Sequence, residues 1–249
     1  MGVGHYQYFS DTLELTIPVN FILPQEINPE TPVLYLLHGF SDNETNWLLN
    51  TRIVKYVEDY QLAVVMPTVY QSYYSDMVHG SKYFTFMIDD LIPHLEKLLP
   101  IGRTQKNRFI CGNSMGGYGA IKLGLATNLF SRAYSLSGAL DIEYFWRDCE
   151  KREERFVDAF GSIEEFSSSK NNLYELMKNE NRNKKVLFRC FCGKDDFLLN
   201  SNRHFYDKAQ KLLKIKYIED EGIHDWDYWD KHIRKVILDI MKSKVDEQR

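Results

Sequence analysis

The chain has few cysteines, no long apolar run and no strong excess of either charge. Its 249 residues include four cysteines and no C-x-x-C pair, which argues against a disulfide framework or a paired-cysteine metal site. No apolar stretch approaches the roughly 18–20 residues that span a bilayer, and residues 1–10 lack the features of a secretory signal. We therefore expect a cytoplasmic protein that does not interact with membranes.

The charge balance and the motifs that are missing exclude further classes. Lysine and arginine total 31 against 35 aspartate and glutamate residues, and this mild acidic excess does not suggest a nucleic-acid partner. No G-x-G-x-x-G, Walker A or H-E-x-x-H pattern occurs, so neither a cofactor nor a metal is expected. Aromatic residues make up 14% of the chain, enough for a core and for the wall of a pocket.

Short apolar runs alternate with segments of helical spacing along most of the chain. The runs predict strands over residues 13–22, 33–37, 62–66, 108–111, 133–136, 186–192 and 215–218. The spacing predicts helices over residues 47–60, 84–99, 115–126, 201–213 and 226–241, with Pro93 kinking or bounding the second. This alternation predicts an α/β fold with a mainly parallel central sheet flanked by helices.

One segment interrupts the alternation. Residues 141–183 are charged, aromatic and helical in pattern, and they are too numerous for a single crossover helix. We expect residues 1–249 to form a single domain, with residues 141–183 as a short helical cap insertion at one end of the sheet.

The sequence GNSMG, residues 112–116, fits the G-x-S-x-G nucleophile elbow. It follows a predicted strand and opens a predicted helix, which places Ser114 on a strained turn with its hydroxyl above the sheet. The flanking glycines avoid clashes with the adjacent strand and helix. The alternative is a glycine-rich turn that binds phosphate or has no function.

A second motif, LLHGF at residues 36–40, follows a buried strand. Acyl transfer needs two backbone N–H donors for the oxyanion, and we assign these to Phe40 and to Met115, the residue after the elbow serine. His38 could be considered a catalytic base, but a histidine at a strand end more often braces a loop, and we prefer that interpretation.

Two further strand ends carry an acid and a base. Asp196 follows the run VLFRCFC and is our candidate for orienting a histidine, with Asp195 as the alternative and helix capping as the structural role for either. His224 lies on the loop before the last predicted helix. The order Ser114, Asp196, His224 is the one expected of α/β-hydrolases.

With these motifs in place, the chain resembles the esterase D-like branch of the α/β-hydrolases, and within it the small bacterial tributyrin esterases. The similar segments are LYLLHGFSDNETNW (residues 34–47), CGNSMGGYGAIKLGL (111–125), CGKDDFL (192–198) and GIHDWDYW (222–229). The resemblance implies an α/β-hydrolase fold and a serine carboxylesterase that hydrolyses short-chain acyl esters through an acyl-enzyme. It implies Ser114 as nucleophile, Asp196 as acid, His224 as base, and Phe40 and Met115 as oxyanion donors.

The chain departs from the family pattern at one position of the H-G-x-x-G-N loop. Asp42 stands where a second glycine is expected, and aspartate tolerates a left-handed backbone better than most residues. The segment of residues 70–83 is only loosely similar to its counterpart in the family.

The pocket wall is predicted from aromatic residues near the motifs. We expect substrate contacts from Trp47, which matches a family tryptophan, and from Tyr73, Tyr74 and Trp229. Phe40, Tyr70 and Trp146 are further candidates; ordinary packing is the alternative for every pocket aromatic except Trp47. The expected partner is a small-molecule ester, and an exposed cap face could serve a homo-oligomer.

Other functions remain open on the sequence alone. The same fold family includes S-formylglutathione thioesterases, esterases of acylated or feruloylated carbohydrates, and acyltransferases. A hydrolase-fold protein that has lost activity and serves only in binding is the non-enzyme alternative.

Overall fold

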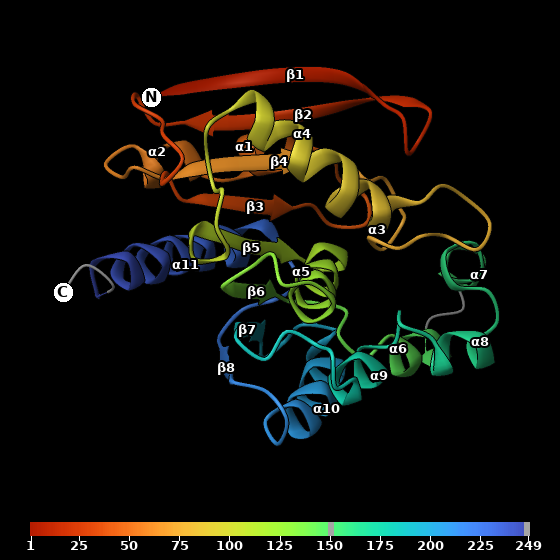
Figure 1. The fold of residues 1–249 in the computed structure, drawn as a ribbon. Coiled ribbons are helices and arrows are strands. Elements are labelled where there is room, and N and C mark those ends of the chain that lie inside the picture. The colour runs from red at the N-terminus through yellow and green to blue at the C-terminus, as the bar shows by residue number, and fades with distance from the viewer. Residues whose placement is uncertain (149–151, 247–249) are drawn as a thin grey trace.

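One eight-stranded sheet runs through the computed structural model, which describes residues 1–148 and 152–246 (Figure 1). The strands are β1 (Gly2–Ser10), β2 (Leu15–Leu23), β3 (Val33–Leu37), β4 (Ala63–Pro67), β5 (Arg108–Asn113), β6 (Arg132–Leu136), β7 (Leu187–Gly193) and β8 (Ile215–Asp220). Their spatial order is β1-β2-β4-β3-β5-β6-β7-β8. Strands β3 to β8 pair in parallel, and β2 is antiparallel to both of its neighbours. The predicted α/β class with a mainly parallel sheet is confirmed.

Helices cover both faces of this sheet, because the central strands are apolar on both sides. In β3, Tyr35 and Leu37 belong to one core cluster, while Leu34 and Leu36 belong to the other. One face carries α3 (Tyr83–Thr85), the π-helical turn η1 (Phe86–Leu91), α4 (Ile92–Leu98), α5 (Met115–Ala126), α9 (Leu173–Lys178) and α10 (Leu199–Ala209). The other carries α1 (Asn46–Asn50), α2 (Ile53–Val57) and α11 (Trp226–Asp246), and a short 3-10 turn, η2 (Gln105–Asn107), precedes β5.

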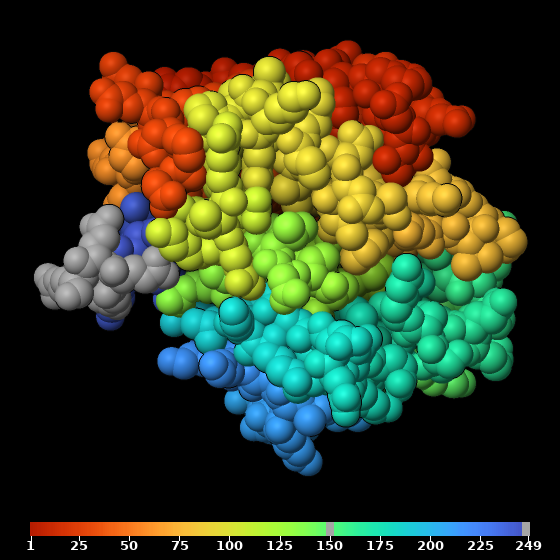
Figure 2. Space-filling model, viewed as in Figure 1, coloured from red at the N-terminus to blue at the C-terminus, as the bar shows by residue number. Residues whose placement is uncertain are grey.

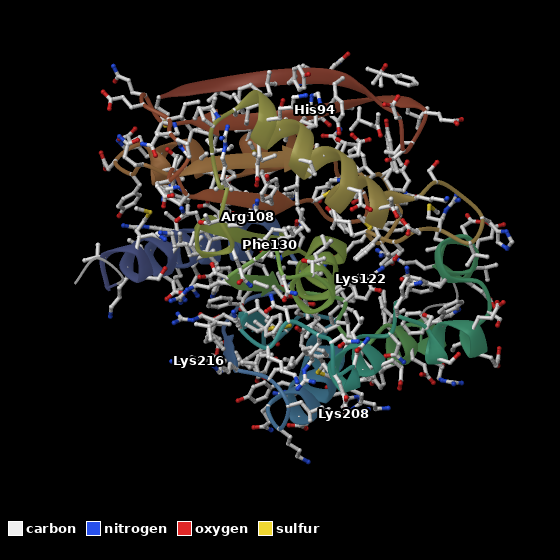
Figure 3. All side chains as sticks on the ribbon, in the orientation of Figure 1. His94, Arg108, Lys122, Phe130, Lys208 and Lys216 are labelled. Atoms are coloured by element: carbon white, nitrogen blue, oxygen red, sulfur yellow. The ribbon has the colours of Figure 1, made fainter. Side chains whose placement is uncertain are left out.

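Strand β1 was not predicted from the sequence. Its inward-facing side carries Gly4, Tyr6, Tyr8 and Ser10 and no aliphatic residue, so the usual apolar alternation is missing. Tyr8 stacks on His94 of α4 with ring centroids 4.3 Å apart, and the Tyr6 hydroxyl lies 2.9 Å from His94 Nε2. His94 is labelled beside α4 in Figure 3. The edge strand is therefore held by ring contacts to α4 as well as by its pairing with β2.

Two predicted helices are divided. Residues 47–60 form α1 and α2, separated at Thr51, whose backbone is extended. Residues 84–99 form most of α3, the turn η1 and α4, with Pro93 in the first turn of α4. Proline lacks the N–H that would continue an α-helix, and the helix ahead of it widens so that Ile92 N–H donates to the Met87 carbonyl.

Residues 141–183 lie between β6 and β7 and contain α6 (Ile142–Asp148), α7 (Glu153–Phe160), α8 (Ile163–Ser168) and α9. Helices α6 to α8 lie beyond the carboxyl ends of the strands (Figure 1). The Val78 and His79 amides donate to carbonyls of α7, and the two segments adjoin in the space-filling view (Figure 2). Aromatic contacts hold these helices together, such as Trp146 with Phe156 at 4.9 Å.

A buried lysine joins the same segments to α5. Lys122 Nζ donates to Ser75 Oγ and to Asn171 Oδ1, each at 2.6 Å, and it points from α5 in Figure 3. Burial holds the pKa of Lys122 well below its usual value. Three parts of the chain near the carboxyl ends of the strands are thus fixed to one another. Within the described residues, no helix is both long enough and apolar enough to cross a membrane.

Candidate active site

Ser114 occupies a sharp turn between β5 and α5. Its φ of +52° and ψ of −117° lie outside the regions that non-glycine residues usually adopt. The turn is tight enough to require glycines beside it. A methyl group on Gly112 would lie 2.4 Å from the Gly116 backbone, and one on Gly116 would lie 2.6 Å from the Leu37 carbonyl oxygen. The sequence therefore forces the hydroxyl of Ser114 to the carboxyl edge of the sheet.

His224 bridges Ser114 and Asp196. It comes from the loop between β8 and α11, and its Nε2 lies 3.0 Å from Ser114 Oγ. Its Nδ1 lies 3.0 Å and 2.9 Å from the two carboxylate oxygens of Asp196, which follows β7. An acceptor at Nδ1 favours the tautomer with its proton on Nδ1, which leaves the Nε2 lone pair facing the serine hydroxyl. This arrangement can remove a proton from Ser114.

Asp196 is built to hold this orientation, and Asp195 is not. The Asp196 side chain is fully buried, and its Oδ1 also accepts from the Leu198 amide at 2.8 Å. Asp195 is exposed and meets the 222 turn only through its backbone, with its amide donating to the Gly222 carbonyl. Of the two adjacent aspartates, the structure brings only Asp196 to the histidine.

The residues predicted to supply the oxyanion donors, Phe40 and Met115, lie on two segments that border Ser114. Phe40 is in the turn after β3 and lines the cavity that holds Ser114, while Met115 is the first residue of α5. Within residues 1–148 and 152–246, neither amide has a hydrogen-bond partner. Free N–H groups at a helix start and on an adjacent turn suit a developing oxyanion.

His38 is a brace at the end of β3. Its Nδ1 lies 2.7 Å from the Gly39 carbonyl oxygen, and its Nε2 accepts from the Val69 amide at 3.0 Å. Burial lowers the pKa of His38 to about 4, so the ring is neutral at pH 7. Both nitrogens are occupied by backbone groups, as the loop-bracing interpretation predicts.

Two adjoining cavities open at this edge of the sheet. One of about 340 Å³ contains Ser114 and His224, and its wall is formed by Gly39, Phe40, Ser41, Asp42, Asn113, Arg152, Phe197, Asp225, Trp226 and Trp229. The other, of about 430 Å³, shares Phe40, Ser41 and Asp42 and adds Tyr70, Gln71, Ser72, Met77 and Tyr83. The turn of residues 40–42 therefore separates the two cavities.

The structure places one of the four predicted substrate contacts in the cavity wall. Trp229 lies in the cavity wall, but Trp47, Tyr73 and Tyr74 are completely buried. Trp47 donates to the Leu37 carbonyl, and the Tyr74 hydroxyl donates to the His38 carbonyl. Trp47 and Tyr74 therefore support the strand end and the loop beneath the site, while the Tyr73 hydroxyl accepts from Arg152 Nη1 at 3.3 Å.

The wall also contains residues that the sequence analysis did not assign. Phe197 and Trp226 stand inside the two segments that carry Asp196 and His224, so their position next to the motifs was an available signal. Arg152 comes from the 141–183 insertion, and its guanidinium lies 4.3 Å from the centre of the Phe40 ring. No sequence pattern pointed to Arg152. Of the further candidates, Tyr70 lines the second cavity, and Trp146 packs against Phe156.

Among the residues that the structure describes, no group of three or more histidine, cysteine, aspartate or glutamate side chains is placed to hold a metal ion.

Comparison with known proteins places this geometry in a family. The model of the esterase family, described as "Putative esterase", matches residues 10–240. An acetyl esterase of Caldicellulosiruptor saccharolyticus is 30% identical over 254 residues, covering 94% of this chain and 96% of that protein.

Two solved structures from Staphylococcus aureus share the fold, each at 27% identity over 96% of this chain and 98% of theirs. They are the fluorophosphonate-binding serine hydrolase FphF, with a TM-score of 0.89, and the S-formylglutathione hydrolase FrmB, with a TM-score of 0.86. The chain belongs to the esterase family and is an α/β-hydrolase-fold serine esterase, a hydrolase of carboxylic esters.

Proposed function

We propose that Ser114, His224 and Asp196 form the catalytic triad of this esterase and that it hydrolyses short-chain acyl esters through an acyl-enzyme. The observation that carries the proposal is the single imidazole that contacts both Ser114 Oγ, at 3.0 Å, and the Asp196 carboxylate. Nucleophile, base and orienting acid are thus connected in the order that this chemistry needs.

The reaction has two halves. Ser114 Oγ attacks the ester carbonyl while His224 Nε2 takes its proton, and the Phe40 and Met115 amides stabilise the oxyanion. His224 then gives the proton to the departing alcohol, which leaves an acyl group on Ser114. Water activated by the same imidazole attacks that acyl group and releases the acid. Asp196 keeps the ring oriented and stabilises its charged form throughout.

The short-acyl assignment is supported by the size of the cavity and by the acetyl esterase relative. A volume of about 340 Å³, walled by Phe197, Trp226 and Trp229, suits a small apolar group beside the nucleophile. The acetyl esterase shares 30% identity across nearly the whole chain.

The Ser114→Ala variant tests the proposed nucleophile. It should lose turnover of p-nitrophenyl acetate and butyrate, together with any acyl burst and any labelling by a fluorophosphonate. The variant should unfold at about the same urea concentration as the wild type, because it loses only the hydroxyl that contacts His224 and keeps the backbone hydrogen bonds of the turn. Turnover at the wild-type level would exclude the mechanism.

A substrate panel tests the class of ester. We expect kcat/KM to be highest for two- to four-carbon acyl groups and to fall for longer chains. S-formylglutathione deserves a place in the panel because the Staphylococcus aureus S-formylglutathione hydrolase has a TM-score of 0.86 to this chain. Acetylated and feruloylated sugars complete it. A preference for the thioester by tenfold or more over an alkyl formate would replace the ester assignment.

We further infer that residues 1–249 form a single domain in which residues 141–183 act as a cap, and that the protein is cytoplasmic and forms a homo-oligomer.

A further inference from the structure

Asp42 stands where the family pattern has a glycine, and its backbone does not take the left-handed conformation that a glycine there would permit. The positive φ values among described non-glycine residues fall elsewhere. The turn after β3 is instead closed by the Asp42 side chain, whose carboxylate accepts a hydrogen bond from the backbone.

Two hydrogen bonds close the turn of residues 39–42. The Gly39 amide donates to Asp42 Oδ2 at 3.2 Å, and the Asp42 amide donates to the Gly39 carbonyl at 3.2 Å. The side-chain bond and the backbone bond thus join the same two residues. Phe40 and Ser41 lie between them, so the direction of the Phe40 amide is set by this closed ring.

The closed turn lies directly against the candidate nucleophile. A methyl group added to Gly39 would lie 2.8 Å from Asp42 Oδ2, 3.0 Å from Asn113 Nδ2 and 3.6 Å from Ser114 Cβ. The Asp42 carboxylate, the Asn113 side-chain amide and Ser114 therefore all lie close to Gly39, and only a residue without a side chain fits there. A shift of this turn by about an ångström would change the distance from the Phe40 amide to the reacting carbonyl.

The other side of the turn is also held. The Phe40 ring packs between the Arg152 guanidinium, 4.3 Å from its centre, and the Tyr73 ring, at 5.7 Å. These contacts fix the side chain of Phe40, whereas the Asp42 carboxylate fixes the backbone on which its amide lies. The two restraints are independent because they act on different atoms.

The charge of Asp42 is not what the turn requires. Burial raises the pKa of its carboxyl, while the nearby Asn113 side-chain amide, the hydrogen bond from Gly39 and the nearby His224 oppose that rise. A carboxylate beside an oxyanion is repulsive, so the charge cannot assist the oxyanion itself. The property of Asp42 that holds the turn is its oxygen atom, which accepts the hydrogen bond from Gly39.

We propose that Asp42 is a positioning residue for the oxyanion-binding turn: its carboxylate oxygen, by accepting the Gly39 N–H, holds the Phe40 amide beside Ser114. The inference rests on the proposed roles of Ser114 and Phe40. It assigns Asp42 an effect on the transition state and not on binding of the ester in its ground state.

Three variants separate the acceptor from the charge. Asp42→Ala removes both and should lower kcat for p-nitrophenyl butyrate about 10- to 100-fold with KM changed less than about threefold, since one oxyanion donor is worth about 10²–10³ and is here only loosened. Asp42→Asn keeps an acceptor for the Gly39 amide and should retain at least about a third of the wild-type kcat. Asp195→Ala removes an exposed aspartate that lines neither cavity; it is the matched control and should leave kcat and KM unchanged.

An inhibitor that imitates the tetrahedral intermediate supplies a readout that loss of structure would not produce. The inhibition constant of butylboronic acid should rise in Asp42→Ala by about the factor by which kcat/KM falls, while the urea midpoint of unfolding stays close to that of Asp195→Ala. The inference is overturned if Asp42→Asn is as slow as Asp42→Ala, or if the loss in Asp42→Ala appears in KM alone. Wild-type kinetics in Asp42→Ala together with an inactive Ser114→Ala would refute the role of Asp42 and leave the proposed function intact.

Discussion

At the scale of single residues, the site depends on which atoms of neighbouring side chains reach one another. Two aspartates are adjacent in the chain, yet only Asp196 has a buried carboxylate aimed at His224. Asp195 points to solvent from the same turn. A difference of one position in the chain after β7 thus decides whether a carboxylate can orient the imidazole.

The two aspartates offer a matched pair of variants. Asp196→Asn should lower kcat for a short-chain ester on the order of 10³–10⁴, because an amide in place of the carboxylate no longer fixes the Nδ1–H tautomer or stabilises the imidazolium. Asp195→Asn should stay within about twofold of the wild type. Steady-state kinetics of both proteins give the comparison, and equal losses in the two would show that Asp196 has no special role.

At the scale of secondary structure, the two elements that were not predicted have different causes, one distant in the chain and one local. Strand β1 lacks an aliphatic pattern and is stabilised by Tyr8 stacking on His94 of α4. The π-helical turn η1 precedes Pro93, where an α-helical hydrogen bond cannot form. The elements with strong local patterns, β3 and α5, begin and end close to where the sequence predicts.

The faces of β1 can be compared directly. Tyr8→Ala should lower the free energy of unfolding by about 2–4 kcal/mol, since it removes a buried ring stacked on His94. Phe9→Ala changes a ring that is 61% exposed on the opposite face and should cost less than about 0.5 kcal/mol. Urea unfolding of the two variants measures both values, and a Phe9 effect as large as that of Tyr8 would contradict the packing of this strand.

At the scale of the whole molecule, the free energy of unfolding depends on a histidine that remains uncharged in the fold. His38 joins the end of β3 to the segment after β4 through its two ring nitrogens. Its pKa is lowered by burial from its usual 6.5 to about 4. Between these values the unfolded chain binds a proton that the folded chain does not, so folding becomes less favourable as the pH falls from 6.5 toward 4.

The expected loss from His38 is about 3 kcal/mol between pH 7 and pH 4, at about 1.4 kcal/mol for each pH unit of the interval. His38→Gln should be less stable than the wild type at pH 7, because it alters the two hydrogen bonds that the His38 ring makes with backbone groups. Its free energy of unfolding should nevertheless fall less steeply toward pH 4. His79→Gln, on an exposed loop, should keep the wild-type dependence. Urea unfolding at several pH values gives the change in the free energy of unfolding with pH for each protein. An equal change in the wild type and in His38→Gln would count against a buried neutral His38.

The fold class, the elbow at Ser114 and the order of Ser114, Asp196 and His224 follow from the amino-acid sequence by itself. Each depends on local patterns: apolar runs that alternate with helical spacing, and glycines where two backbones approach within contact. Only the tertiary structure decided that Asp196 and not Asp195 meets the histidine, that Trp47, Tyr73 and Tyr74 are buried, and that Arg152 and the Asp42 turn border the cavity. Those outcomes depend on which distant segments pack together, and a side chain's exposure and partners are set by that packing and not by its neighbours in the chain.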